Sequence, residues 1–105
     1  MPMSALDDIR KYAPNASEAV VAKMESVYRL ALTNADARLV SFSDPAELGR
    51  VRDSFVKEKL GVTESDAAID AAIAAVGDKV PGHKQRLTVY YLLAEHYGKL
   101  SVFGG

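Results

Sequence analysis

The sequence contains no cysteine and no tryptophan among its 105 residues. Without cysteine, disulfide bonds, zinc–thiolate sites and catalytic thiols are excluded, and a reducing compartment is favoured. No apolar run approaches the roughly 18 residues that a membrane-spanning helix needs, since the longest apolar-rich stretch covers only residues 87–94. Acidic residues, Asp7 and Asp8, stand where a signal peptide would be apolar. We therefore expect a cytoplasmic protein without membrane partners.

A large net charge is also lacking, because acidic and basic residues nearly balance and the net charge is −1. A chain of this kind has no general attraction for nucleic acid or anionic membranes, so we expect no nucleic-acid partner. The charges are unevenly distributed: residues 61–78 carry four acids and no base, and residues 79–105 carry four bases and one acid. We interpret these two segments as neighbours that complement each other in the fold.

The length and the spacing of apolar residues predict one helical domain over residues 1–105. We expect five helices, over residues 5–13, 18–33, 45–60, 63–76 and 84–97. The sharpest start is at Asp44, which can cap the third helix and is followed by Pro45 and by Glu47 three residues on. Gly61 and Gly77 are the expected stops of the third and fourth helices.

The last predicted helix is apolar on nearly all sides, because Thr88 is the only polar residue between Leu87 and Ala94. A helix of this kind is normally buried. A buried strand is the alternative, but the flanking segments extend the pattern beyond strand length. We predict a compact all-α array of about five helices with this C-terminal helix at its centre. How residues 35–43 and 99–105 pack stays open.

Few residues suggest metal binding or acid–base catalysis. Glu95 and His96 are adjacent, and neighbouring helical side chains point about 100° apart, so they do not converge on one metal ion. Asp66 and Asp70 share a helix face, but paired carboxylates act in acid–base catalysis only where burial separates their pKa values. We predict no catalytic residue, no metal site and no cofactor.

The third predicted helix carries four bases, Arg50, Arg52, Lys57 and Lys59, with acids between them. Nucleic-acid binding favours a surface of one sign, so we interpret this helix as a solvated, salt-bridged face and, second, as a site for a small anion. Tyr90 and Tyr91 point to different sides of the last helix, where either could line a pocket or simply pack in the core. The candidate ligand-binding residues are therefore Arg38, Arg50, Tyr90 and Tyr91.

Three segments, residues 5–12, 40–48 and 89–95, carry a family likeness: Ala-Leu-Asp-Asp-Ile-Arg-Lys-Tyr, Val-Ser-Phe-Ser-Asp-Pro-Ala-Glu-Leu and Val-Tyr-Tyr-Leu-Leu-Ala-Glu. The chain resembles a small bacterial, mainly alphaproteobacterial, family known as domain of unknown function 2853. The resemblance covers nearly the whole chain and implies an all-helical bacterial protein. It supplies no activity, cofactor or catalytic residue.

Three hypotheses about function follow. The first is a non-enzymatic protein that associates with a partner or with itself as a homodimer, because the fourth helix is rich in alanine and the last helix and tail are strongly apolar. The second is a module that binds a small anionic ligand through the residues named above. The third is an enzyme with an unrecognised site, which only the adjacent pair Glu95 and His96 supports.

Overall fold

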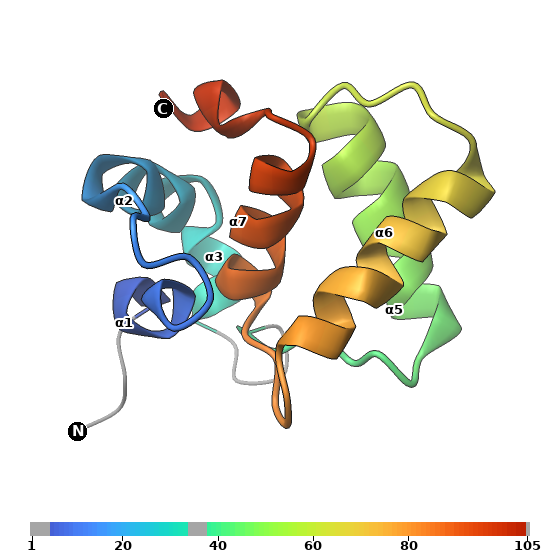
Figure 1. Ribbon diagram of the computed structural model, residues 1–105, viewed down its shortest axis with the longest axis horizontal. Helices are drawn as coiled ribbons and strands as arrows, with labels where there is room; N and C mark the ends of the chain where they lie inside the picture. Colours follow the sequence, from blue (N-terminus) through green and yellow to red (C-terminus); the bar gives the residue numbers. More distant parts are fainter. Residues whose placement is uncertain (1–4, 34–37, 105) are drawn as a thin grey trace.

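The computed structural model describes residues 5–33 and 38–104. This part of the chain is all-α and contains no strand, as the sequence predicts, apart from one isolated bridge between Leu39 and Gln85 (Figure 1). The elements are the α-helices α1 (Ala5–Arg10), α2 (Glu18–Val27), α3 (Arg29–Leu32), α5 (Pro45–Arg50), α6 (Asp66–Lys79) and α7 (Arg86–His96), the π-helix η1 (Val51–Lys59), and the 3-10 helix η2 (Leu100–Phe103).

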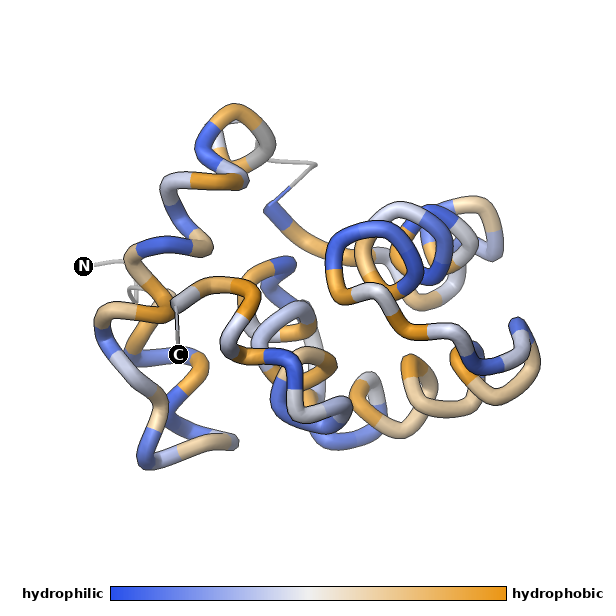
Figure 2. The backbone as a smooth tube through the Cα atoms, turned by 90° about the horizontal axis from the view of Figure 1, so that it is seen from above, coloured by the Kyte–Doolittle hydropathy of each residue, from blue (hydrophilic) through white to orange (hydrophobic). Residues whose placement is uncertain are grey.

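Helix α7 is the centre of the fold. It packs against α1, α2, η1, α6 and η2, and Figure 1 shows it between α1 and α2 on one side and α5 and α6 on the other. Every residue from Leu87 to Ala94 is buried. Hydrophobic and hydrophilic residues alternate along the surrounding helices (Figure 2), so each can turn an apolar face inward. The prediction of a central C-terminal helix is confirmed, and the strand alternative is wrong.

The helix expected over residues 18–33 is divided at Tyr28, which leaves the α-helical conformation with φ −105° and ψ 19°. The ring of Tyr28 packs edge-on against Tyr90, with ring centroids 5.1 Å apart, and also contacts Phe55 and Phe103. These partners lie far from Tyr28 in the sequence. The apolar spacing within residues 18–33 therefore did not predict the break.

The helix expected over residues 45–60 changes geometry halfway, from the α-helix α5 to the π-helix η1. At its end the backbone N–H of Leu60 donates to the carbonyl of Phe55, five residues back, at 2.9 Å. Its start is as predicted, because the side chain of Asp44 accepts from the backbone of Ala46. Gly61 follows with φ 72°, the left-handed conformation expected of a stop.

Helix α6 differs from its prediction at both ends. Ser65 rather than Thr63 caps it, by accepting from the backbone of Ala68, and it runs through Gly77 to Lys79. Gly77 is therefore not a stop. The ring of Phe42 lies so close to its backbone that a Cβ atom would overlap the ring, which makes this glycine a point of close approach.

The segments left open by the sequence dock on the core. Of residues 35–43, the first three lie outside the described part, and Leu39 and Val40 run extended beside Lys84 and Gln85. The tail forms η2 and buries Phe103. None of the described helices has the length and apolar character needed to cross a membrane.

Candidate functional site

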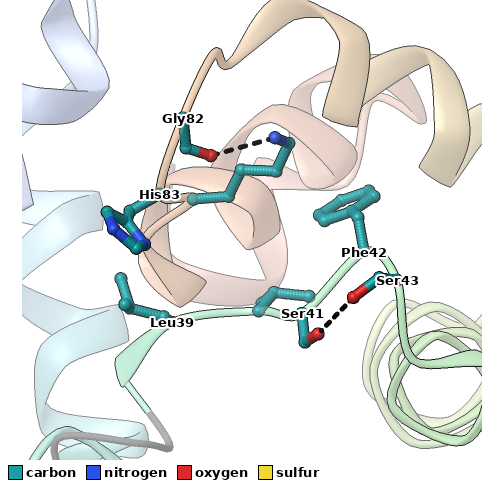
Figure 3. Close-up of a pocket in the computed structure, with 8 residues that line it drawn as sticks. Leu39, Ser41, Phe42, Ser43, Gly82 and His83 are labelled. Carbon is teal, nitrogen blue, oxygen red and sulfur yellow. Dashed lines mark hydrogen bonds between the residues drawn. The ribbon is translucent and has the colours of Figure 1, made fainter.

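An open pocket lies where two segments distant in sequence meet, residues 39–43 and 82–84 (Figure 3). The backbone N–H of Val40 donates to the carbonyl of Lys84 at 2.8 Å, which joins the two segments. Gly82, with φ 71°, makes the turn that brings the second segment back toward the first. We call this cavity the two-loop pocket.

The two-loop pocket has a volume of about 540 Å³, within the roughly 300–1,000 Å³ typical of small-molecule sites. Its lining is part apolar and part polar, and none of it is acidic. The lining residues are Leu39, Val40, Ser41, Phe42, Ser43, Gly82, His83 and Lys84. A site of this composition offers hydroxyl, imidazole and ammonium groups beside an apolar wall.

The polar groups of the pocket are close to one another. The hydroxyls of Ser41 and Ser43 are 3.2 Å apart, and the Lys84 ammonium donates to the carbonyl of Gly82 at 3.1 Å (Figure 3). The same ammonium lies 5.4 Å from the centroid of the Phe42 ring. The nearest carboxylate along the chain, Asp44, is engaged as the cap of α5. The pocket can therefore donate several hydrogen bonds to a guest and presents positive charge to it.

Next to the pocket, a largely buried ion pair joins the first turns of α5 and α7. The carboxylate of Glu47 accepts from Arg86 and, at 2.7 Å, from Arg50. Arg86 also donates to the hydroxyl of Tyr90 at 2.9 Å, and the Tyr90 ring stacks on Phe55 with centroids 3.8 Å apart. The pair is thus tied into the aromatic core.

The packing and the charges around this ion pair shift the pKa of the Glu47 carboxyl and of the neighbouring Tyr90 hydroxyl. Burial by itself raises the pKa of the Glu47 carboxyl, but the hydrogen bonds and charges of Arg86 and Arg50 outweigh it, so the pKa lies below its usual range. Burial raises the pKa of Tyr90, and the charge of Arg86 opposes that shift only in part. At neutral pH Glu47 is therefore ionised and the Tyr90 hydroxyl is neutral.

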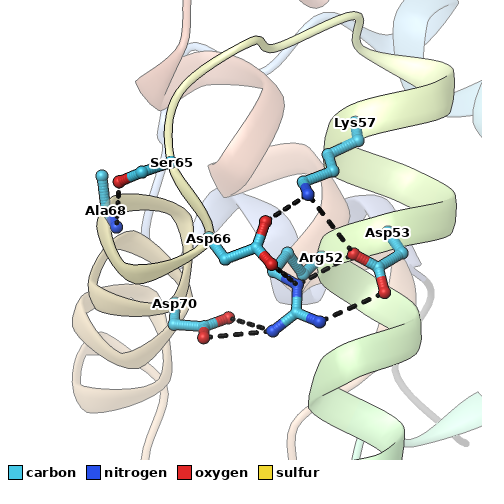
Figure 4. Close-up of polar contacts among 7 residues, drawn as sticks. All are labelled: Arg52, Asp53, Lys57, Ser65, Asp66, Ala68 and Asp70. Carbon is cyan, nitrogen blue, oxygen red and sulfur yellow. Dashed lines mark hydrogen bonds and ion pairs between the residues drawn. The ribbon is translucent and has the colours of Figure 1, made fainter.

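A second group of charges joins η1 to α6 at the surface (Figure 4). Arg52 pairs with Asp53 at 2.8 Å and with Asp70 at 3.2 Å, and Lys57 pairs with Asp66. The expected salt-bridged face on the third predicted helix is present. The acids of α6 take these partners from η1 and not from residues 79–105, so the expected complement between segments 61–78 and 79–105 is wrong for Asp66 and Asp70.

The four candidate ligand-binding residues do not gather in one pocket. Arg38 is exposed and directly precedes the first pocket segment, and Arg50 is exposed but bound to Glu47. Tyr90 and Tyr91 are both buried in the core. Among the residues that the structure describes, hydrogen bonds through Glu47 and Arg86 link Arg50 to Tyr90. A role of these four residues in ligand binding stays a prediction.

Glu95 and His96 are both exposed, and the His96 ring packs edge-on against Tyr97. Within residues 5–33 and 38–104, no three His, Asp or Glu side chains come together in a way that could hold a metal ion.

Sequence reasoning missed the pocket residues Ser41, Ser43, His83 and Lys84. Of these, His83 follows the Pro81-Gly82 turn and is exposed, and Lys84 is partly exposed. The available signals were the Ser-Phe-Ser triplet before the Asp44 cap and the His-Lys pair after Pro81-Gly82. Neither signal indicates a site alone, because only the chain fold brings the two segments together.

Two comparisons with known proteins bear on identity. A family model described as a protein of unknown function (DUF2853) matches residues 4–101. No curated protein matches the chain.

Proposed function

We propose that this chain, which belongs to the DUF2853 family of proteins of unknown function, is a non-enzymatic module that binds a small organic anion in the two-loop pocket. The observation that carries the proposal is the composition of the lining: two hydroxyls, an imidazole and an ammonium, with no carboxylate. The expected location is the cytoplasm, in keeping with a sequence without cysteine.

The lining favours a carboxylate attached to an apolar group. Hydrogen bonds from an ammonium to a carboxylate are charge-assisted and stronger than neutral ones, which assigns the charged end of the guest to Lys84. Leu39 and Phe42 form an apolar wall, and an inorganic ion has no apolar group that could pack against it. An apolar group on the guest would instead remove this wall from water.

Nuclear magnetic resonance titration with three small aromatic probes tests the proposal. Benzoate carries the carboxylate, benzamide is its neutral analogue and benzylammonium is its cationic analogue. We expect benzoate to shift the amide resonances of residues 39–43 and 82–84, with weaker shifts for benzamide and none for benzylammonium. Equal shifts for all three probes, or none for benzoate, would overturn the proposal.

Two lysine variants make the test specific. Lys84→Gln removes the ammonium at the pocket and should abolish the preference for benzoate over benzamide. Lys23→Gln removes an exposed ammonium from α2 and should leave that preference unchanged. Loss of the preference in both variants would mean that benzoate responds to overall charge and not to the pocket.

Self-association is a second candidate function, favoured by the outward face of α6. The charges of Asp66 and Asp70 are paired with η1, whereas the exposed residues of the helix include five alanines, at positions 67, 68, 71, 74 and 75. Small residues at helical spacing allow a second helix to approach closely. The apolar surface of α7 no longer supports association, because neighbouring elements of the same chain cover it.

Light scattering coupled to size-exclusion chromatography tests self-association at tens of micromolar protein. We expect a dimer that Ala71→Glu converts to a monomer, because the substitution places a charge in the contact. Ala22→Glu, on the exposed face of α2, is the matched control and should leave the dimer intact. A monomeric wild-type protein would remove this second candidate and leave the pocket proposal untouched.

A further inference from the structure

We infer that the buried Glu47–Arg86 ion pair holds the two-loop pocket in its binding geometry, so that both residues are positioning residues for the anion. This inference rests on the proposed function. Neither residue lines the pocket. Each is nevertheless at the start of the helix into which one pocket segment runs: α5 begins at Pro45, shortly after Ser43, and α7 begins at Arg86, two residues after Lys84.

The chain connectivity shows why the pair matters for the pocket. Residues 40–47 are attached to residues 84–86 at both ends, through the hydrogen bond from Val40 to Lys84 and through the ion pair between Glu47 and Arg86. The pocket hydroxyls of Ser41 and Ser43 lie between these two attachments. The backbone that carries these hydroxyls is therefore held against residues 84–86 on both sides of the pocket.

The ion pair is itself firmly held. Glu47 also accepts two hydrogen bonds from Arg50, and Arg86 donates to Tyr90, whose ring stacks on Phe55. The side chains of Glu47 and Arg86 are only 11% and 13% exposed. A support of this kind fixes the position of groups that contact a ligand, and looser support lowers affinity without removing any contact group.

Substitution of either partner should therefore weaken benzoate binding while Lys84 stays in place. We expect Glu47→Gln and Arg86→Gln each to raise the dissociation constant for benzoate on the order of threefold to tenfold, as expected for a site that loses its pre-organisation. Arg86→Lys keeps the positive charge beside Glu47 and should recover part of the affinity. The titrations are run well below the melting temperature of every variant.

Thr88→Val is the matched control, because it breaks a different buried side-chain hydrogen bond that joins α7 to a distant helix. Thr88 donates to Asp8 of α1, and neither residue lines the pocket. We expect this variant to melt at a lower temperature than wild type and to bind benzoate with unchanged affinity. A purely structural role of Glu47 would give the same result for Glu47→Gln as for Thr88→Val.

The possible outcomes separate this inference from the proposed function. If the wild type does not bind benzoate, the proposed function fails and the inference fails with it. If the wild type binds, but Glu47→Gln and Arg86→Gln bind equally well or Thr88→Val weakens binding as much, only the inference is overturned.

Arg50→Ala keeps the test decisive if the buried variants do not fold. The Arg50 side chain is 64% exposed, so its loss should be tolerated. The substitution nevertheless removes the two hydrogen bonds that Arg50 donates to Glu47. We expect about a twofold rise in the dissociation constant for benzoate, for the same reason of weaker pre-organisation. An unchanged constant would overturn the inference.

Discussion

In the described part of the chain, two groups of oppositely charged side chains join helices, and they differ in how far water reaches them. Glu47 and Arg86, between α5 and α7, are nearly enclosed. In the group between η1 and α6, the carboxylates of Asp66 and Asp70 are about half exposed. Water and salt screen the second group but hardly reach the first. Similar pairs of residue types should therefore contribute very differently to stability and to function.

Breaking the enclosed pair should give the largest effect. Arg86→Met leaves the Glu47 carboxylate largely buried with Arg50 as its remaining donor, and we expect a loss of about 3 kcal/mol in the free energy of unfolding, at the lower end for a broken buried pair. Urea denaturation at neutral pH measures it. A loss below about 1 kcal/mol, as for surface pairs, would remove the contrast between the two groups.

Replacing both partners should cost less than replacing one. In the double variant Glu47→Met with Arg86→Met, no buried charge is left unpaired, and apolar side chains fill the space. We expect at least half of the stability lost in Arg86→Met to return. The Tyr90 hydroxyl loses its donor, which costs about 1 kcal/mol, so recovery should be incomplete. A double variant no more stable than the single one would contradict this expectation.

Acid should weaken the enclosed pair in a defined pH range. Because the pKa of Glu47 lies below its ordinary value of 4.5 in the folded chain, ionised Glu47 contributes its full stabilisation above pH 4.5. That contribution is lost as the pH falls through the folded pKa. The stability advantage of the wild type over Glu47→Gln should therefore shrink below pH 4.5. Urea denaturation of both proteins over this range checks the sign, and a constant difference would refute it.

The exposed group should give the smallest effect. Arg52→Gln removes contacts to Asp53 and Asp70, whose carboxylates are about half exposed. We therefore expect a shift in melting temperature smaller than that of Thr88→Val. The shift should vanish in 1 M salt, where screening acts within about 3 Å. A shift that persists at high salt would show that this group is as protected as the enclosed pair.

The helices were largely predictable because their signals are local. The cap at Asp44 and the apolar run from Leu87 to Ala94 each specify an element without reference to the rest of the chain. The prediction for Gly77 was wrong because it also used only local signals, and a glycine near the end of a helical pattern resembles a stop. The side chain that requires glycine at this position is the ring of Phe42, which is 35 residues earlier in the chain.

The candidate site was not predictable to the same degree. The sequence indicated an anion site as one hypothesis, but it assigned Tyr90 and Tyr91, which the core buries. Ser41 and Ser43 are short polar residues in a segment that the sequence left open, and Lys84 was expected to begin a helix. No periodicity connects residues 39–43 with residues 82–84, so the pocket they form could not be read from spacing.

The sequence by itself determined that the chain is helical, where most helices begin, and that the last helix is buried, because caps, glycine stops and apolar spacing act within a few residues. The tertiary structure alone decided the break at Tyr28, the π-helical geometry of η1, and the partners of Glu47 and Lys84. Each of these depends on contacts between segments that are far apart along the chain, and such contacts form only when the core is packed.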